Sequence, residues 1–495
     1  MRNSQHIKYK VFTIATLTAF SMLAQADESD PNEQVKKLKQ MVEKLQQQRL
    51  EQDKQMEILT KELVGVENQL SQSNIVKAVE KGSSKGAPVL ANFKDGLVFE
   101  DGTGNWKLQL NGRIQTDYRA FKPDDWKNDT FSIRRARFGG TFSFLKDFAV
   151  RVEGEYANDN TGAKGTAALT YGYLDYTHWA AAKVRVGQFK PFFGLERPQS
   201  TNFTDFTELS LATNNGAIFT SNYDRGVMVF GDPLPWLNYN AYVVNGSGQN
   251  NDAVRDSKDV GGRIDANFAN FTDNKDLVLH AGASASSGSI GFSTATGSGI
   301  TQSTEGNGVQ FFNAAFILPV HTDRTRWGLE TALAYGPVKF QGEYINSNFE
   351  GKRAPTAAGV GTSFDNDIKA WYADLTWLVT GESYADTYKS GVFGRIKPKN
   401  NFDDKGGWGA LELGLRYSEF DASDFKSILA LPTATAPNTF TSEANAWTAG
   451  GKWILNPNAR LMLNYIHTKF DTDIRVNGKL DDAEDAVVLR AQYDF

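Results

Sequence analysis

The sequence contains no cysteine among its 495 residues, which excludes a disulfide framework, a thiolate-bound zinc ion and a thiol nucleophile. The formal net charge is only −5 at pH 7 and gives no bulk attraction to nucleic acid, so no nucleic-acid partner is predicted. Long apolar runs are also missing: beyond residue 26 no stretch reaches the 18 residues that a transmembrane helix needs. A mature chain that lies in a membrane must therefore form a closed barrel, because only helices and closed barrels satisfy every backbone polar group in lipid.

The sequence also has few residues that suggest a catalytic site. The sequence has five scattered histidines and neither an HExxH nor a GxSxG motif. An outer-membrane enzyme is therefore the least favoured interpretation, and no cofactor or metal ion is implied. The histidines are His6, His178, His280, His321 and His467.

The first residues are typical of a secretory signal. Arg2, Lys8 and Lys10 precede an apolar run over 11–23, and Ala24-Gln25-Ala26 follows. We expect a signal peptide over residues 1–26. A membrane anchor is the alternative, but the run is too short to span comfortably.

A heptad pattern follows the signal. Apolar residues recur at two positions of a 3.5-residue period between residues 35 and 73, with polar breaks at Arg49, Gln52 and Ser73. The pattern predicts an N-terminal α-helical coiled coil within residues 27–80, followed by a linker over 81–95 that contains Gly and Ser. The number of helices in it is not readable, because the apolar positions are mixed.

From Gly96 onward the apolar period changes to two. Between Trp106 and Ala120 the even positions are mostly apolar, and the odd positions are polar or charged. The last strand ends at Phe495, and an aromatic terminal residue resembles the C-terminal signature of bacterial outer-membrane proteins. This alternation predicts an all-β transmembrane barrel over residues 96–495.

Sixteen such segments can be counted, an even number as expected for a bacterial barrel of about 16 antiparallel strands. The segment 309–318 is an extra candidate. Short turns alternate with long polar connections such as 191–223, 287–324 and 382–407, as expected for two different barrel ends. A soluble sandwich or propeller is a weaker alternative. The predicted strands are 106–120, 130–144, 147–158, 167–178, 182–190, 224–231, 237–245, 259–271, 276–286, 325–336, 337–348, 367–381, 408–420, 443–455, 458–471 and 487–495.

Arginines form the densest charged cluster. Arg135 and Arg137 share the predicted lumen face of one strand, whereas Arg134 is out of phase unless a β-bulge re-aims it. Arginines at a constriction stabilise anions through charge-assisted hydrogen bonds. They can equally serve only to keep the lumen polar beside its acidic residues. Further lumen-side candidates are Arg113, Arg151, Lys183 and Arg185.

The segment after Gln188 mixes aromatic and charged residues, including Phe193, Glu196 and Phe206. Such a loop is suited to fold against the barrel wall, so we expect it to fold inward and narrow the pore.

Four motifs, namely GRIQ at Gly112, IRRARFGG from Ile133, GQFKPFFGLERPQST from Gly187 and YDRGV from Tyr223, resemble the phosphate-selective porin O/P family. The resemblance covers the chain from about residue 86 to its end. It implies a sixteen-stranded trimeric barrel whose third loop folds into the pore, where basic residues lead to a central anion site.

The family's site residues carry over only in part. By motif, Arg113, Arg134 and Arg135 would be central anion ligands, and Arg197 stands where members have a loop lysine. Ser200 and Thr201 stand where members have two serines, while Lys190 and Arg137 occupy positions that vary. Leu209 replaces a third-loop arginine, and Tyr171 replaces the lumen aspartate.

The resulting expectation is a homotrimeric porin in lipid of the bacterial outer membrane, with its coiled coil in the periplasm. Small anionic solutes, with phosphate or oligophosphate as candidates, would cross it by passive diffusion. One alternative is a general or carbohydrate-type porin without anion specificity. Another is an envelope tether whose coiled coil contacts peptidoglycan or a periplasmic partner.

Overall fold

The computed structural model describes residues 39, 40, 42–44 and 46, and residues 89–495 except 94–95, 103, 158–166, 217, 221, 254–255, 291–299, 315–321, 353–362 and 429–438. The chain divides into a unit of residues 1–86 and a unit of residues 87–495. The described residues between Lys39 and Gln46 are helical. The predicted signal peptide and the rest of the predicted coiled coil lie outside the described residues.

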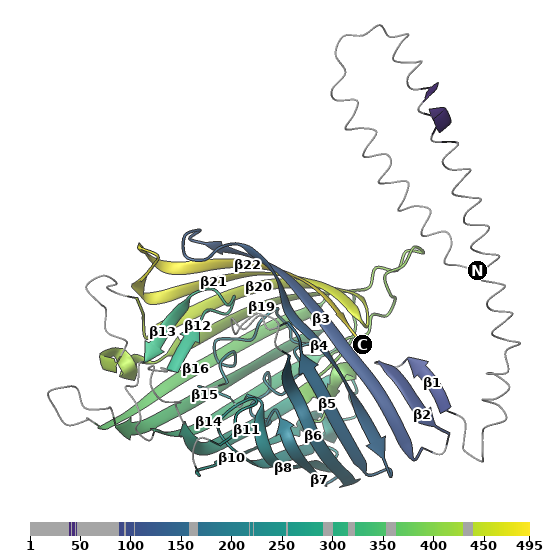
Figure 1. The fold of residues 1–495 in the computed structure, drawn as a ribbon, viewed down its shortest axis with the longest axis horizontal. Helices are drawn as coiled ribbons and strands as arrows, with labels where there is room; N and C mark the ends of the chain where they lie inside the picture. The colour runs from purple at the N-terminus through teal and green to yellow at the C-terminus, as the bar shows by residue number, and fades with distance from the viewer. Residues whose placement is uncertain are drawn as a thin grey trace, which may run out of the picture. The chain divides into compact units, whose positions relative to one another are not determined.

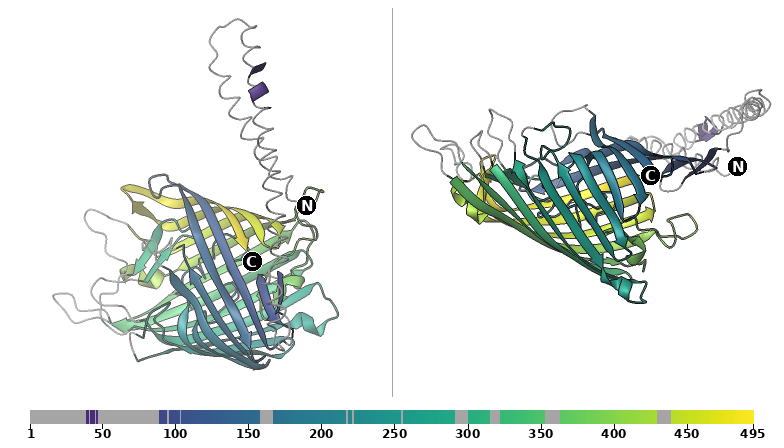
Figure 2. Two further views of the ribbon diagram at one scale, coloured as in Figure 1. Left: turned by 45° about the vertical axis from the view of Figure 1, so that its right-hand side comes forward. Right: turned by 90° about the horizontal axis from the view of Figure 1, so that it is seen from below.

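A closed antiparallel barrel forms the second unit (Figures 1 and 2). In the described part of the chain, each of sixteen wall strands pairs with the next, and the last pairs with the first. The predicted strand number is therefore confirmed. The wall strands are β3 (Trp106–Lys122), β4 (Thr130–Phe144), β5 (Phe148–Glu155), β6 (Ala168–Trp179), β7 (Ala182–Phe189), β8 (Asp224–Leu234), β9 (Leu237–Val244), β10 (Asp259–Asn267), β11 (Leu277–Ile290), β14 (Thr322–Tyr335), β15 (Val338–Lys352), β16 (Ser363–Leu378), β19 (Ala410–Asp421), β20 (Glu443–Asn456), β21 (Ala459–Val476) and β22 (Lys479–Asp494).

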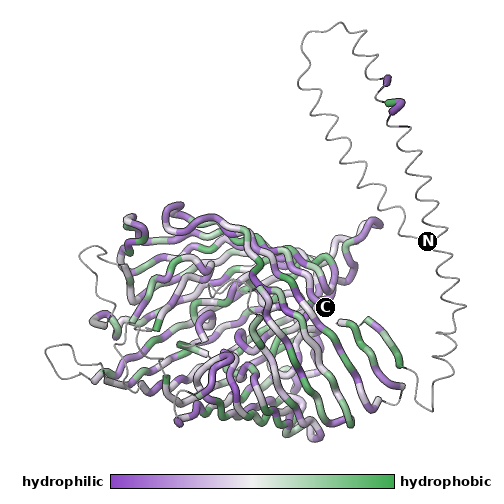
Figure 3. Tube along the Cα trace, in the orientation of Figure 1, coloured by the Kyte–Doolittle hydropathy of each residue, from purple (hydrophilic) through white to green (hydrophobic). Residues whose placement is uncertain are grey.

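The barrel is polar inside and apolar outside. Strand β14 alternates buried and exposed residues along its whole length. Its buried side carries Arg324, Arg326 and Glu330, whereas Trp327 and Leu329 are exposed. Hydrophobic and hydrophilic residues alternate in the same way along most wall strands (Figure 3). A water-soluble barrel would bury the apolar side, so this arrangement suits a lipid-facing exterior.

Aromatic side chains contact one another on the outside of the wall near both ends of the strands. Near the long-loop end, the ring of Tyr417 lies 5.2 Å from that of Trp371 and 4.8 Å from that of Trp447. Near the short-turn end, the ring of Phe148 lies 5.5 Å from that of Phe144 and 5.0 Å from that of Tyr176. Such girdles mark the two membrane–water interfaces of an outer-membrane barrel.

The position of the membrane along the strands can be tested on β14. Leu329 is 56% exposed midway along the strand, and Tyr335 is 62% exposed at its end. Leu329→Arg is expected to lower the free energy of unfolding in lipid vesicles by about 2–4 kcal/mol, because it places a charge in the bilayer centre. Tyr335→Arg, the matched control at the interface, should cost about 1 kcal/mol or less. Equal costs for both variants in urea titrations would contradict the assigned depth.

The two ends of the barrel have different connections. Tight turns join β4 to β5, β6 to β7, β14 to β15 and β20 to β21, and this end faces the periplasm in outer-membrane barrels. The long connection predicted over 382–407 is also at this end, so its expected position among the long loops is wrong. This connection, residues 379–409, is called the turn insertion below. It contains η2 (Ala385–Thr387), β17 (Tyr388–Lys389) and β18 (Val392–Phe393).

The extra candidate strand at 309–318 does not join the wall. Its residues 310–314 form β13 (Gln310–Ala314), which pairs only with β12 (Ile300–Ser303) in a separate two-stranded sheet. The side chains of Phe311 and Phe312 are fully buried, so the apolar pattern that suggested a strand serves packing within the barrel instead.

The linker predicted over 81–95 ends in a strand. Residues 89–93 form β1 (Val89–Phe93), which pairs with β2 (Leu97–Asp101). Strand β2 then pairs with the first residues of β3, on the side where β22 ends. The barrel sheet therefore begins earlier than the predicted boundary at residue 96, because the edge of β3 beyond the last residue of β22 needs a partner.

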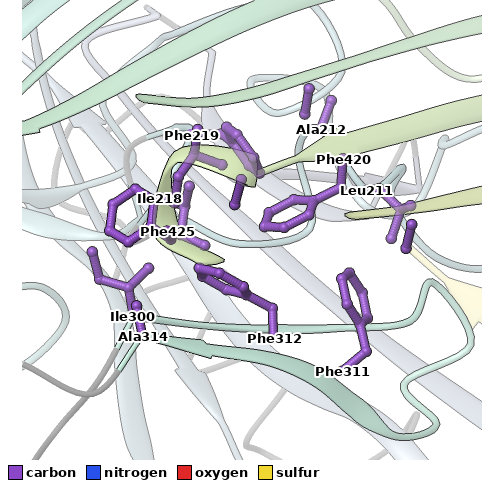
Figure 4. Close-up of a cluster of buried hydrophobic side chains, with 14 of the residues drawn as sticks. Leu211, Ala212, Ile218, Phe219, Ile300, Phe311, Phe312, Ala314, Phe420 and Phe425 are labelled. Atoms are coloured by element: carbon purple, nitrogen blue, oxygen red, sulfur yellow. The ribbon is translucent and has the colours of Figure 1, made fainter. Parts of the chain in front are cut away.

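An apolar cluster fills one side of the lumen (Figure 4). Phe219 comes from the loop between β7 and β8, Phe312 from β13, Phe420 from β19 and Phe425 from η3 (Ser423–Ile428). The rings of Phe219 and Phe312 lie 5.8 Å and 5.2 Å from that of Phe420. Loops thus occupy the lumen beside this part of the wall. No helix in the described part of the chain is long and apolar enough to cross a membrane.

Candidate functional site

The loop between β7 and β8, residues 190–223, is the third long-side connection and is called the third loop below. Its side chains and backbone contact lumen-facing residues across the barrel. Glu196 accepts a hydrogen bond of 2.5 Å from Arg416 of β19, and Asp205 accepts one of 2.7 Å from Lys339 of β15. Thr207 N–H donates to Asn464 of β21 at 2.7 Å. These two ion pairs and one neutral hydrogen bond hold the loop inside the barrel.

A bulge turns Arg134 toward the lumen. Gln115 of β3 pairs with Arg135, and the next residue, Thr116, pairs with Ile133, so Arg134 is the extra residue. The bulge expected from the sequence is therefore present. It explains why Phe131 and Ile133, which are out of phase with the strand that follows, face outward.

Arg134 meets a carboxylate there. Its Nε and Nη2 donate to Glu208 of the third loop at 2.7 Å and 3.0 Å. Arg119 and Arg490 also donate to Glu208, at 2.7 Å and 2.9 Å. Although burial opposes it, Arg134 and the other two guanidinium groups hold the pKa of Glu208 well below its usual value. Arg134 thus ties the loop to the wall rather than presenting an unpaired charge.

Three further arginines share Glu153 of β5. Arg151 lies 2.7 Å from its carboxylate, Arg137 3.5 Å and Arg113 3.8 Å. Arg137 has a second partner in Glu155 at 2.6 Å. One buried carboxylate therefore cannot neutralise this group of guanidinium ions, even with the help of Glu155.

Three predicted residues contribute charge without an acidic partner. Among the described residues, no carboxylate lies within ion-pair distance of Arg135, Lys190 or Arg197. Arg135 donates to the amide oxygen of Gln115 at 2.8 Å. Lys190 donates to the carbonyl oxygen of Arg197 at 3.0 Å, and Arg197 donates to that of Thr213 at 3.2 Å. This part of the lumen has an excess of positive charge.

A cavity of about 250 Å³ opens within this charged region and is called the anion cavity below. It brings together four of the eight predicted site residues: Arg113, Lys190, Ser200 and Thr201. Arg137 and Arg197 contact its lining residues, since Arg137 donates to the Tyr223 hydroxyl at 2.7 Å and Arg197 accepts from Lys190. Arg134 and Arg135 do not line it. The other lining residues are Arg151, Tyr171, Tyr173, Arg185, Phe192, Pro198 and Tyr223.

Hydroxyl groups add neutral donors to the cavity. The Thr201 hydroxyl accepts a hydrogen bond of 2.7 Å from Arg113, and the Ser200 hydroxyl accepts one of 3.3 Å from the Asn202 N–H. A hydroxyl that accepts still has its own hydrogen to donate. Both side chains can therefore donate to an anion in the cavity.

Of the aromatic residues that line the cavity, sequence reasoning placed only Tyr171 in the lumen. The guanidinium carbon of Arg151 lies 4.3 Å from the Tyr171 ring centre, and that of Arg185 lies 3.8 Å from the Tyr173 ring centre. The period-two pattern could have placed Tyr173 in the lumen, because it shares a face with Asp175. Tyr223 begins the YDRGV motif and could have been chosen on that basis.

The charge of Lys190 is set by its surroundings. Burial lowers its pKa, the positive charges of Arg197, Arg137 and Arg113 lower it further, and the result is about 7 despite the opposing effect of Tyr223. Burial raises the pKa of Tyr223, but the charges of Arg137, Lys190 and Arg113 outweigh it and bring the pKa to about 7. Both groups therefore change charge near neutral pH.

Comparison with known proteins identifies the family to which the chain belongs. Residues 108–495 match the family model described as phosphate-selective porin O and P. The chain is 25% identical over 435 residues to Porin O of Pseudomonas aeruginosa, covering 83% of this chain and 94% of that protein. Among solved structures, OprB of Pseudomonas putida has a TM-score of 0.50 and 11% identity, covering 79% of this chain and 94% of that one. An anion-selective porin from Comamonas acidovorans has a TM-score of 0.49 and 14% identity, covering 79% of this chain and all of that one. The chain thus belongs to the phosphate-selective porin O and P family and is a porin of the outer membrane.

Proposed function

We propose that the protein lets small anionic solutes diffuse through the outer membrane and that the anion cavity is its selective site. Arg113, Lys190, Ser200 and Thr201 contact the solute, while Arg135, Arg137 and Arg197 supply positive charge nearby. The observation that carries the proposal is the group of cations without carboxylate partners, of which Lys190 is buried and lines the cavity. Arg134 acts as an anchor for the third loop, which narrows the pore.

The physical basis is partial replacement of the anion's hydration shell. A unit charge 4 Å from an opposite one gains about 4 kcal/mol at the effective dielectric of a partly buried site. Several cations and two hydroxyl donors can offset the cost of stripping water from phosphate. The cations are also spread over loop and wall, so that an anion can leave one contact for the next.

We further propose that the protein is a homotrimer, as the family resemblance implies, and that the coiled coil lies in the periplasm. A general or carbohydrate-type porin remains the alternative if the basic residues serve only lumen polarity. The tether alternative depends on residues 27–80, almost all of which lie outside the described part of the chain.

Single-channel recording tests the anion proposal. Reversal potentials across a salt gradient should show preference for chloride over potassium. Addition of inorganic phosphate should reduce chloride conductance in a saturable manner, because phosphate occupies the anion cavity for longer than chloride does. A cation-selective pore, or conductance that phosphate does not change, would favour the general porin.

The charge change of Lys190 predicts a pH dependence. Between about pH 6 and pH 8, block of chloride conductance by sulfate is expected to weaken several-fold, because Lys190 loses its proton above its pKa of about 7. Loss of the Tyr223 proton acts in the same direction. Sulfate is chosen because its own charge is constant over this range. Lys190→Arg should make the profile shallower, since arginine stays protonated and only Tyr223 still titrates in this range. An equally steep profile in that variant would assign the titration to groups other than Lys190.

A further inference from the structure

A second cavity of about 220 Å³ adjoins the anion cavity and is called the aromatic cavity below. Phe192 and Pro198 of the third loop line both cavities. The rest of its lining comes from β7 to β10 near their short-turn ends and from Ser390 and Val392 of the turn insertion. A solute that leaves the anion cavity toward the short turns therefore meets this second space.

Apolar side chains dominate one wall of the aromatic cavity. The rings of Phe192 and Phe230 lie 6.1 Å apart and nearly perpendicular, at 85°. Both side chains are only partly buried, whereas the neighbouring Phe193 and Phe206 of the third loop are fully buried. Phe192 and Phe230 thus present surface to the cavity that packing of the loop does not cover.

The charges around this cavity are paired. Lys183 lies 3.1 Å from Asp232, and Arg263 lies 2.6 Å from Glu330 and 3.0 Å from Asp265. A small inorganic anion gains little here, because each cation already has a carboxylate. What the cavity offers instead is apolar and aromatic contact. In volume it exceeds an engineered apolar cavity of about 150 Å³ that holds a benzene molecule.

Arg185 connects the two cavities. It lines the anion cavity, yet its guanidinium carbon lies 4.9 Å from the centre of the Phe230 ring. Lys183 Nζ lies 5.7 Å from the same ring centre. Arg185 is itself paired with Asp175 at 2.8 Å, so it adds little charge for an anion, but its guanidinium group joins the linings of the two cavities. Because the cavities also share Phe192 and Pro198, a charged group held by Arg113 and Lys190 and an attached ring can occupy both at once.

We propose that the aromatic cavity binds the apolar part of organic anions whose charged group occupies the anion cavity. The preferred solutes are then aromatic phosphate monoesters and carboxylates rather than inorganic phosphate. This inference rests on the proposed function, because it needs the charged group to bind first. It names the substrate class of the same channel.

Phenyl phosphate and inorganic phosphate provide the test, each titrated against the chloride conductance of the full-length protein in planar bilayers. Phenyl phosphate is expected to block at a concentration about tenfold lower, since partial burial of a ring contributes about one order of magnitude in affinity. Phe230→Ala should bring the two half-blocking concentrations to within about twofold. Phe402→Ala is the matched control, because Phe402 lies in the turn insertion but lines neither cavity, and it should keep the tenfold ratio.

Val392→Asn changes a lining residue from the turn insertion and provides a second variant if Phe230→Ala fails to assemble; it should also reduce the ratio. Equal block by both compounds in the unmodified protein, with inorganic phosphate still saturable, would overturn this inference and leave the proposed function intact. A ratio that survives both variants would place the ring elsewhere and would also overturn it. Absence of block by either compound would instead remove the proposed function.

Discussion

Glu208→Gln is expected to destabilise the folded barrel by about 3 kcal/mol, because it leaves buried guanidinium groups without their shared carboxylate. Arg134 loses its acidic partner, whereas Arg119 and Arg490 retain Asp117. The third loop then loses one of its attachments to β3, β4 and β22. Chloride preference should increase at the same time, since the lumen gains one positive charge. Urea unfolding in lipid vesicles and reversal potentials measure the two effects.

Glu443→Gln is the matched control for this variant. Glu443 pairs with Lys426 at 2.7 Å, but the two side chains are 32% and 56% exposed. An exposed pair of this kind contributes at most about 1 kcal/mol. If Glu208→Gln unfolded like the control and kept the original reversal potential, Glu208 would not anchor the loop.

Removal of positive charge from the anion cavity should weaken phosphate block. Lys190→Met and Arg113→Met are each expected to raise the half-blocking phosphate concentration at least about tenfold, equivalent to about 1.4 kcal/mol per variant. The physical reason differs between them. Lys190 has no carboxylate partner within the described residues, so below its pKa of about 7 its charge acts on the solute rather than on an acidic side chain. Arg113 also positions the Thr201 hydroxyl, to which it donates at 2.7 Å.

Lys183→Met provides the comparison, because it removes the same charge from the same side of the lumen. Lys183 is paired with Asp232 and lines only the aromatic cavity. Its loss should change inorganic phosphate block by less than about threefold, in keeping with the small value of a partly exposed ion pair. Equal effects of Lys190→Met and Lys183→Met would indicate a diffuse lumen potential rather than a local site.

The wall of the barrel could be predicted because the alternation of apolar and polar residues is a property of each strand by itself. A strand that separates lipid from water must alternate, so the period of two between Trp106 and Ala120 is visible without a partner. The bulge at Arg134 was also readable, since the phase of the apolar residues changes there. The strand extensions beyond residue 471 were missed, although Asn477-Gly478 is a typical hairpin turn whose residues both have positive φ.

The contents of the lumen could not be predicted, because they depend on contacts distant in sequence. Nothing near Arg134 indicates that Glu208 will neutralise it. The turn insertion contains aromatic residues such as Tyr384, whose hydroxyl donates to Glu412 of β19 at 3.0 Å, and this inward position is not encoded in a local pattern. The cluster of basic residues in the sequence therefore predicted the region of the site. It did not predict which of these residues have acidic partners and which can bind a solute.

The seam between β22 and β3 has a consequence for biogenesis. Gln115 and Gln492, 377 residues apart, share a hydrogen bond of 2.8 Å, and the backbone of Phe495 exchanges two with Gly112. The barrel can therefore close only when strand β22 is available to pair with β3. Until then two unpaired strand edges would face lipid, where backbone groups without hydrogen-bond partners cost free energy. A chain cut short of β22 would leave the edge of β3 without a partner and could not form a closed barrel.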